Sequence, residues 1–168
     1  MEFAKRVAVI TGGGSGIGRA VAAAMASAES TIDLGGDARR VLYVEDNPAN
    51  VLLMQDLMSA FESIELVAAS TAETGIELAI HRRPHLIIMD INLPGMSGLD
   101  ALRALRARAE TQDIPVIALS AAASTRDRER GERAGFHRYL TKPVRVDELL
   151  PVLEEVLVES PAASPRLR

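Results

Sequence analysis

The chain has 168 residues, of which 48% are hydrophobic and 25% are charged, which is typical of a globular protein with one ordinary domain and a modest extension. Its net charge of −4 argues against general nucleic-acid binding, which requires a basic face. The lack of cysteine excludes disulfides, thiolate metal sites and a cysteine nucleophile. No apolar run could span a bilayer, and glycines interrupt the only run that could belong to a signal peptide. We therefore expect a soluble, cytoplasmic protein that binds neither nucleic acid nor membrane.

The first expected element is a strand at residues 6–11 (RVAVIT), followed by a glycine loop and an alanine-rich helix at 17–28. Residues 30–40 are polar, contain a Gly-Gly pair and are predicted to form a linker. Residues 160–168 (SPAASPRLR) are predicted to form a flexible tail. The chain is thus expected to divide into an appendage at 1–29, the linker, a main domain at 41–159 and the tail.

The main domain alternates strand-like and helix-like segments. Strands are expected at 41–45, 64–70, 85–90, 114–120 and 138–140, and the helices after them at 47–61, 72–83, 99–108, 124–135 and 146–159. Asn47 is a suitable N-cap, with Pro48 at the first helical position. Continuous apolar strands alternating with helices predict an α/β fold with a doubly wound parallel sheet, covered on both faces.

In such a fold, the residues that end the strands meet in one crevice, where ligands bind. These residues are Glu45, Asp46, Asp90, Ser120 and Lys142. Three converging carboxylates repel one another unless protons or a cation intervene, and an all-oxygen site suits Mg²⁺ with retained waters. The added lysine and hydroxyl suit a phosphoryl group, so the set predicts a carboxylate nucleophile that forms an aspartyl-phosphate.

Each of these residues also has a structural interpretation. Asp90 alone could be a turn residue, and Ser120 could cap the next helix. The Glu45–Asp46 pair could be the solvated start of a helix. Lys142 is harder to explain in this way, because the chain otherwise uses arginine and has only one other lysine, Lys5. The combination therefore indicates function more strongly than any single member.

Four segments, taken in order, give a specific pattern: VLYVEDNPAN, LIIMDINLPGMSG, PVIALSA and YLTKP. Over roughly residues 40–158 the chain resembles the receiver domain of two-component response regulators. The resemblance implies a flavodoxin-like fold with strand order 2-1-3-4-5, which agrees with the parallel sheet expected from the strand pattern.

The resemblance also implies roles for the acidic residues. Asp90 falls on the phosphoacceptor, and Asp46 on a direct Mg²⁺ ligand. Glu45 falls on the neighbouring acid that acts through metal-bound water. Asn92 falls on the position whose backbone carbonyl completes the metal shell.

The remaining positions imply a switch. Ser120 falls on the hydroxyl that binds the phosphoryl group, Lys142 on the lysine that pairs with it, and Tyr139 on the switch aromatic. A histidine kinase or histidine phosphotransfer protein would be the donor, and an unidentified downstream partner would read the change. The protein would then be a signalling switch that takes part in its own phosphorylation and dephosphorylation, and not a metabolic enzyme.

The segment VAVITGGGSGIGRA resembles the first strand, glycine loop and helix of short-chain dehydrogenases. Gly12, Gly16 and Gly18 match the cofactor-binding pattern T-G-x-x-x-G-x-G, in which small residues admit a pyrophosphate. No Tyr-x-x-x-Lys pair follows, because Asn47 and Pro143 stand four residues after the two tyrosines. An NAD(P)-binding dehydrogenase fragment remains the alternative function.

The appendage could be a natural fusion or part of an engineered chimera without a biological role. Its strand is apolar on both faces, and such a strand is prone to aggregate if it is left unpaired. We therefore expect residues 7–10 to add to an outer edge of the sheet or to pair with a second chain in a dimer.

Overall fold

The computed structural model describes residues 38–157, apart from 60, 62 and 122–124. The strand expected at 6–11, the helix expected at 17–28 and the tail expected at 160–168 lie outside the described residues. So do the proposed edge pairing of residues 7–10 and the three glycines of the cofactor-like loop.

Strands and helices alternate through the described part of the chain, as the sequence predicts. The strands are β1 (Arg39–Val44), β2 (Ile64–Ala69), β3 (Leu86–Asp90), β4 (Val116–Ser120) and β5 (Arg138–Thr141). The helices are α2 (Pro48–Met58), α3 (Ala72–Arg82), α4 (Gly98–Arg106), α5 (Thr125–Ala134) and α6 (Val146–Leu157).

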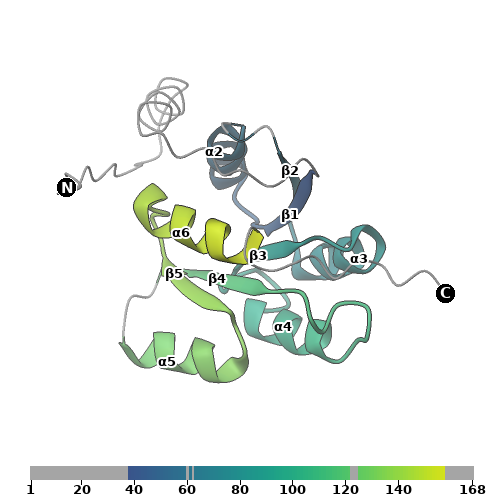
Figure 1. Cartoon of the computed structure of the whole chain (residues 1–168). Coiled ribbons are helices and arrows are strands. Elements are labelled where there is room, and N and C mark those ends of the chain that lie inside the picture. The colour runs from purple at the N-terminus through teal and green to yellow at the C-terminus, as the bar shows by residue number, and fades with distance from the viewer. Residues whose placement is uncertain (1–37, 60, 62, 122–124, 158–168) are drawn as a thin grey trace.

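The strands form one sheet in the order β2-β1-β3-β4-β5, and every neighbouring pair is parallel (Figure 1). The interior strand β1 pairs with two others, so that Val41 lies opposite Leu66 on one side and Leu86 on the other. This is the predicted flavodoxin-like arrangement, and the strand order is confirmed.

Two apolar layers hold the helices on the sheet. Because side chains alternate along a strand, Val41 and Tyr43 of β1 face α2 and α6, whereas Leu42 and Val44 face the opposite layer with α3 and α4. All four side chains are at most 1% exposed. Burial of each large apolar side chain stabilises the fold by about 1.5–3 kcal/mol.

Polar caps fix where three helices begin. Asn47 accepts a hydrogen bond from the Ala49 amide at 2.9 Å and is followed by Pro48, as predicted. Thr71 accepts from the Thr74 amide at the start of α3, and Ser97 from an amide in the first turn of α4. The caps place each helix directly after the loop that follows a strand end.

Several boundaries differ from the sequence prediction by one to three residues, among them the start of β1 and the end of α2. The first strand begins at Arg39 and not at 41, because the Arg39 amide donates to the Ser63 carbonyl at 2.7 Å and the Arg40 amide to Nδ1 of His85 at 3.0 Å. Two residues of the expected linker thus belong to the sheet. The helix expected at 47–61 ends at Met58, where the Ser59 amide bonds back to the Gln55 carbonyl.

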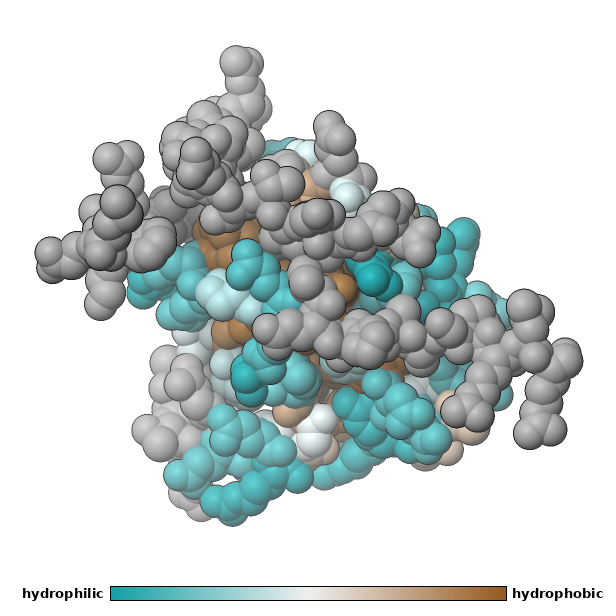
Figure 2. Space-filling view, viewed as in Figure 1, coloured by the Kyte–Doolittle hydropathy of each residue, from teal (hydrophilic) through white to brown (hydrophobic). Residues whose placement is uncertain are grey.

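Hydrophilic residues cover much of the described surface that is visible in Figure 2, and apolar residues show between them. Leu52 of α2 is the only large hydrophobic residue in the described ranges that is markedly exposed, at 63%. Among the helices that the structure describes, none is both long and apolar enough to cross a membrane.

Candidate functional site

The five residues predicted to meet at the strand ends do lie together, at the carboxyl-terminal end of the parallel strands. Glu45 and Asp46 follow β1, Asp90 ends β3, Ser120 ends β4 and Lys142 follows β5. Because β1, β3, β4 and β5 are parallel and adjacent, their carboxyl ends point in one direction. The topology therefore brings together groups separated by up to 97 positions in the chain.

Three carboxylates form the acidic part of this site. One oxygen atom from each of Glu45, Asp46 and Asp90 lies within 4.8 Å of the others. Glu45 and Asp90 are buried, at 1% and 5% exposure, whereas Asp46 is exposed. Like charges at this spacing repel, so the cluster favours the binding of a cation.

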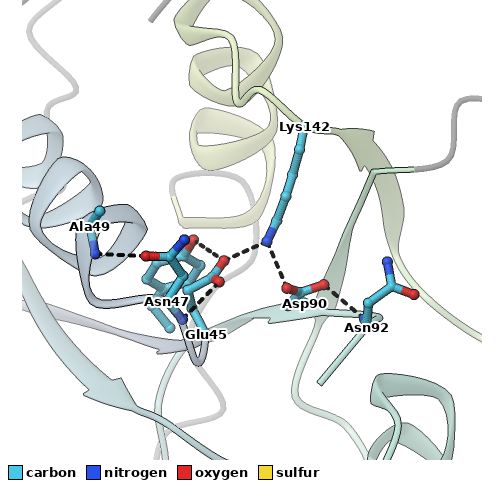
Figure 3. Close-up of polar contacts among 7 residues, drawn as sticks. Glu45, Asn47, Ala49, Asp90, Asn92 and Lys142 are labelled. Atoms are coloured by element: carbon cyan, nitrogen blue, oxygen red, sulfur yellow. Dashed lines mark hydrogen bonds and ion pairs between the residues drawn. The ribbon is translucent and has the colours of Figure 1, made fainter. Parts of the chain in front are cut away.

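The ammonium group of Lys142 lies between the two buried carboxylates (Figure 3). Its Nζ atom is 2.6 Å from Oε2 of Glu45 and 2.6 Å from Oδ2 of Asp90. Burial alone would lower the pKa of Lys142, but the hydrogen bonds that it donates to Asp90 and Glu45 raise the pKa above its ordinary value. Lys142 therefore remains a cation that offsets part of the acidic charge.

Glu45 is held from three directions. Its Oε1 accepts a hydrogen bond from the Asn47 amide at 3.2 Å, and its Oε2 accepts from the Tyr43 hydroxyl at 2.9 Å as well as from Lys142. Burial opposes ionisation of Glu45, but hydrogen bonds, of which that from Lys142 is the largest, keep its pKa below the ordinary value. Burial and the Glu45 charge raise the pKa of Tyr43, so its hydroxyl keeps its proton.

Asp90 is fixed by the loop that follows it. The Asn92 amide donates to Oδ1 of Asp90 at 2.8 Å, which leaves Oδ2 for Lys142 (Figure 3). This loop closes tightly on α4, because a Cβ atom on Gly98 would lie 2.4 Å from the Asp90 carbonyl oxygen. Glycine at 98 therefore permits the approach of the helix that supports the Asp90 loop.

Ser120 and Tyr139 lie on the neighbouring strands. Ser120 is 2% exposed, and its carbonyl accepts a hydrogen bond from the Lys142 amide at 2.8 Å. Tyr139 is 8% exposed, and its ring belongs to the apolar layer under α3 and α4. A Cβ atom on Gly131 of α5 would lie 2.4 Å from this ring.

The donor set fits a hard divalent cation such as Mg²⁺, because it offers carboxylate oxygens without nitrogen or sulfur. The two oxygens of Glu45 already accept hydrogen bonds, whereas Asp46 is exposed. Asp46 is accordingly better placed than Glu45 to bind the cation directly.

Sequence reasoning did not identify Tyr43 as part of this site. The available signal was the strand period of two, which puts residues 43 and 45 on the same face of β1. Tyr43 was hidden because an aromatic residue in a buried strand is fully explained by packing.

Comparisons with known proteins point to one family. The response regulator receiver domain family matches residues 41–154. The polar-differentiation response regulator DivK of Brucella anthropi is 36% identical over 119 residues, which cover 71% of this chain and 96% of that protein.

Two solved structures are similar over the same region. One is the receiver domain of the sensor histidine kinase PA1611 from Pseudomonas aeruginosa, solved with a magnesium ion coordinated in the active site cleft. It matches with a TM-score of 0.65 and 31% sequence identity, and the match covers 71% of this chain and 98% of that one. The other is the receiver domain of Ssk1 from Saccharomyces cerevisiae, in a co-crystal with the histidine phosphotransfer protein Ypd1. It matches with a TM-score of 0.64 and 27% sequence identity, and the match covers 71% of this chain and 89% of that one.

Proposed function

From the premise that the chain belongs to the response regulator receiver domain family of two-component signalling, we propose that Asp90 accepts a phosphoryl group from a phosphohistidine, with Mg²⁺ bound beside it. The observation that carries the proposal is the contact of one cation, Lys142, with both buried carboxylates at 2.6 Å. The complex of a similar receiver domain with a phosphotransfer protein supports a histidine kinase or phosphotransfer protein as donor.

Mg²⁺ would be held by Asp46, Asp90 and the Asn92 backbone carbonyl, with Glu45 acting through water, and would offset negative charge on the phosphoryl oxygens. An oxygen of Asp90 attacks the phosphorus, the P–N bond to the donor imidazole breaks, and the imidazole leaves with the bond's electron pair. Most of the catalysis by this chain would consist of positioning and charge neutralisation.

Lys142 would change partner during this step. Its Nζ atom already touches Oδ2 of Asp90, so a phosphoryl group on Asp90 would lie within reach of the same ammonium. A compact ammonium on a flexible stem suits this exchange from carboxylate to phosphate. The Ser120 hydroxyl, at the end of the adjacent strand, would bind a second phosphoryl oxygen.

The output would be a population shift on the face made by α5, β5 and α6. In the proposed switch, movement of Ser120 toward the phosphoryl group favours the inward position of Tyr139, which is the position that this structure shows. The outward position would belong mainly to the unphosphorylated population. The protein would thus act as a signalling module and not as an enzyme with turnover on an external substrate.

The donor would approach over α2. This helix begins two residues after Asp46 and carries Leu52, which is 63% exposed.

The test is intact-mass measurement after incubation with acetyl phosphate and Mg²⁺. We expect the parent chain to gain the mass of one phosphoryl group, and the gain to be lost when EDTA replaces Mg²⁺. Asp90→Asn should remain unmodified, because an amide oxygen is a much weaker nucleophile. Equal modification of Asp90→Asn would refute the proposal.

The alternative of NAD(P) binding rests on Gly12, Gly16 and Gly18, which lie outside the described residues. Titration of NADPH followed by its fluorescence separates the two functions. Tight binding that disappears with Gly16→Val would favour the alternative, since added side chains would block the pyrophosphate.

A further inference from the structure

Tyr43 carries a hydroxyl group at a position where packing requires only a ring. Its side chain is 1% exposed, and the ring belongs to the apolar layer that α2 and α6 bury against the sheet. Phenylalanine would fill the same space without a polar atom. Because a buried hydroxyl is unfavourable unless it is hydrogen-bonded, the contact made by this hydroxyl sets tyrosine apart from phenylalanine here.

That contact is with the acidic site. The hydroxyl donates to Oε2 of Glu45 at 2.9 Å, and the two residues stand on the same face of β1 and its extension. Oε2 is also the atom that Lys142 contacts, at 2.6 Å. Glu45 therefore has two donors on one oxygen, one of them rigid and one mobile.

The two donors differ in their freedom to move. The Lys142 side chain is 20% exposed and has a flexible four-carbon stem. In the proposed function, Lys142 turns to the phosphoryl group on Asp90 and its contact with Glu45 is weakened. The buried ring of Tyr43 cannot turn away in this manner, so its hydroxyl stays on Oε2.

We infer that Tyr43 is a positioning residue that holds the Glu45 carboxylate toward the metal position whether Lys142 pairs with carboxylates or with phosphate. This inference rests on the proposed function, because it describes a residue of that same site. Groups that hydrogen-bond to the direct ligands of a metal typically change its affinity by 10- to 100-fold. Because Glu45 would act through water, Tyr43→Phe should weaken Mg²⁺ binding measurably but by no more than about tenfold.

The experiment measures the Mg²⁺ dissociation constant from amide chemical shifts in the full chain. Thr111→Val is the matched control, because it also removes a hydrogen bond made by a buried hydroxyl. Thr111 follows the end of α4, and its hydroxyl donates to the Leu105 carbonyl at 2.8 Å. We expect weaker Mg²⁺ binding in Tyr43→Phe and unchanged binding in Thr111→Val. Unchanged binding in Tyr43→Phe would overturn the inference.

A double-mutant cycle shows whether Tyr43 acts through Glu45. In the Glu45→Gln background, the charge that Tyr43 positions is absent, so Tyr43→Phe should have little further effect on Mg²⁺ affinity. An equal loss of affinity in both backgrounds would mean that the substitution loosens the fold generally, which also overturns the inference.

A second measurement keeps the inference testable if Tyr43→Phe folds poorly. The chain has only two tyrosines, so 3-fluorotyrosine gives two ¹⁹F resonances, and Tyr139→Phe identifies which belongs to Tyr43. The Tyr43 resonance should shift with the same Mg²⁺ dissociation constant as the amides, and a static resonance would count against the role.

The outcomes for the two proposals are distinct. If the parent chain shows no saturable Mg²⁺ response, the proposed function fails. If the parent responds and Tyr43→Phe responds identically, only the role of Tyr43 fails.

Discussion

A Cβ atom on Gly131 would lie 2.4 Å from Cδ2 of Tyr139 and 2.8 Å from its Cε2. The Tyr139 ring therefore lies inward only because the facing residue of α5 has no side chain. Glycine is a poor residue for a helix interior, so its helical preference does not explain its presence there. The inward position of the proposed switch residue thus depends on one residue of a neighbouring helix.

Gly131→Ala should destabilise the protein or expel the Tyr139 ring, at a cost of about 1–3 kcal/mol for overpacking. In the Tyr139→Ala background, Gly131→Ala should instead stabilise the protein. Space is then available for the added methyl group, and alanine is favoured over glycine in a helix by about 1 kcal/mol. Denaturant unfolding of the four proteins gives both values. A destabilising effect of the same size in both backgrounds would contradict the packing relationship.

Asp46→Asn should stabilise the metal-free protein and remove most of its stabilisation by Mg²⁺. The substitution removes one of three clustered negative charges, an interaction on the order of 1 kcal/mol for exposed charges about 4 Å apart. It also removes a proposed ligand, so Mg²⁺ should raise the unfolding temperature less than in the parent. Thermal unfolding with Mg²⁺ and with EDTA measures both effects.

The matched control is Asp56→Asn, which removes an exposed carboxylate from α2 outside the acidic cluster. It should leave the Mg²⁺-dependent change in unfolding temperature unchanged. A full Mg²⁺ effect in Asp46→Asn would show that the cation binds without this carboxylate.

Lys142→Ala should destabilise the metal-free protein, because Glu45 and Asp90 would be left buried without their cation. Loss of one partner of a buried ion pair typically lowers the free energy of unfolding by about 3–5 kcal/mol. Because the Lys142 side chain is 20% exposed, we expect a decrease of about 3 kcal/mol. Lys142→Arg should restore only part of this, since a planar guanidinium is wider than an ammonium. Urea unfolding at neutral pH checks both variants, and wild-type stability in Lys142→Ala would contradict the electrostatic role.

His85 should make the fold sensitive to mild acid. Burial, and then the positive charge of Arg39, lower the pKa of His85, and its Nδ1 accepts a hydrogen bond from the Arg40 amide. The unfolded chain therefore binds a proton at a higher pH than the folded protein does. The free energy of unfolding should fall as pH drops below the ordinary histidine pKa of about 6.5.

The measurement compares the parent with His85→Asn, whose side-chain oxygen can still accept from the Arg40 amide. The variant should lose less stability between about pH 7 and about pH 5.5, the range in which an ordinary histidine titrates. An identical pH dependence would assign the effect to other groups.

The sequence was sufficient to predict the sheet and most of its helices. Residues 86–89 are apolar on both faces of the strand, and the N-cap Asn47 followed by Pro48 marks a helix start that the structure shares. The pairing of Arg39 with Ser63 could not be predicted, because arginine in a polar segment carries no strand signal. The early end of the helix after Met58 was hidden for the opposite reason, since Phe61 continues the apolar pattern.

The strand-end residues of the site could be predicted because parallel topology alone brings Glu45, Asp90 and Lys142 to one edge. Their detailed contacts could not. That Lys142 bridges the two buried carboxylates depends on side-chain orientation, which the positions of residues in the sequence do not determine. The two glycines that allow close approach, Gly98 and Gly131, likewise have meaning only once their neighbours in space are known.

The strand that precedes Lys142, β5, is the last that the structure describes, and it forms one side of the five-stranded sheet. A fragment that ends before residue 142 would therefore contain all three carboxylates of the acidic cluster without the ammonium that balances two of them.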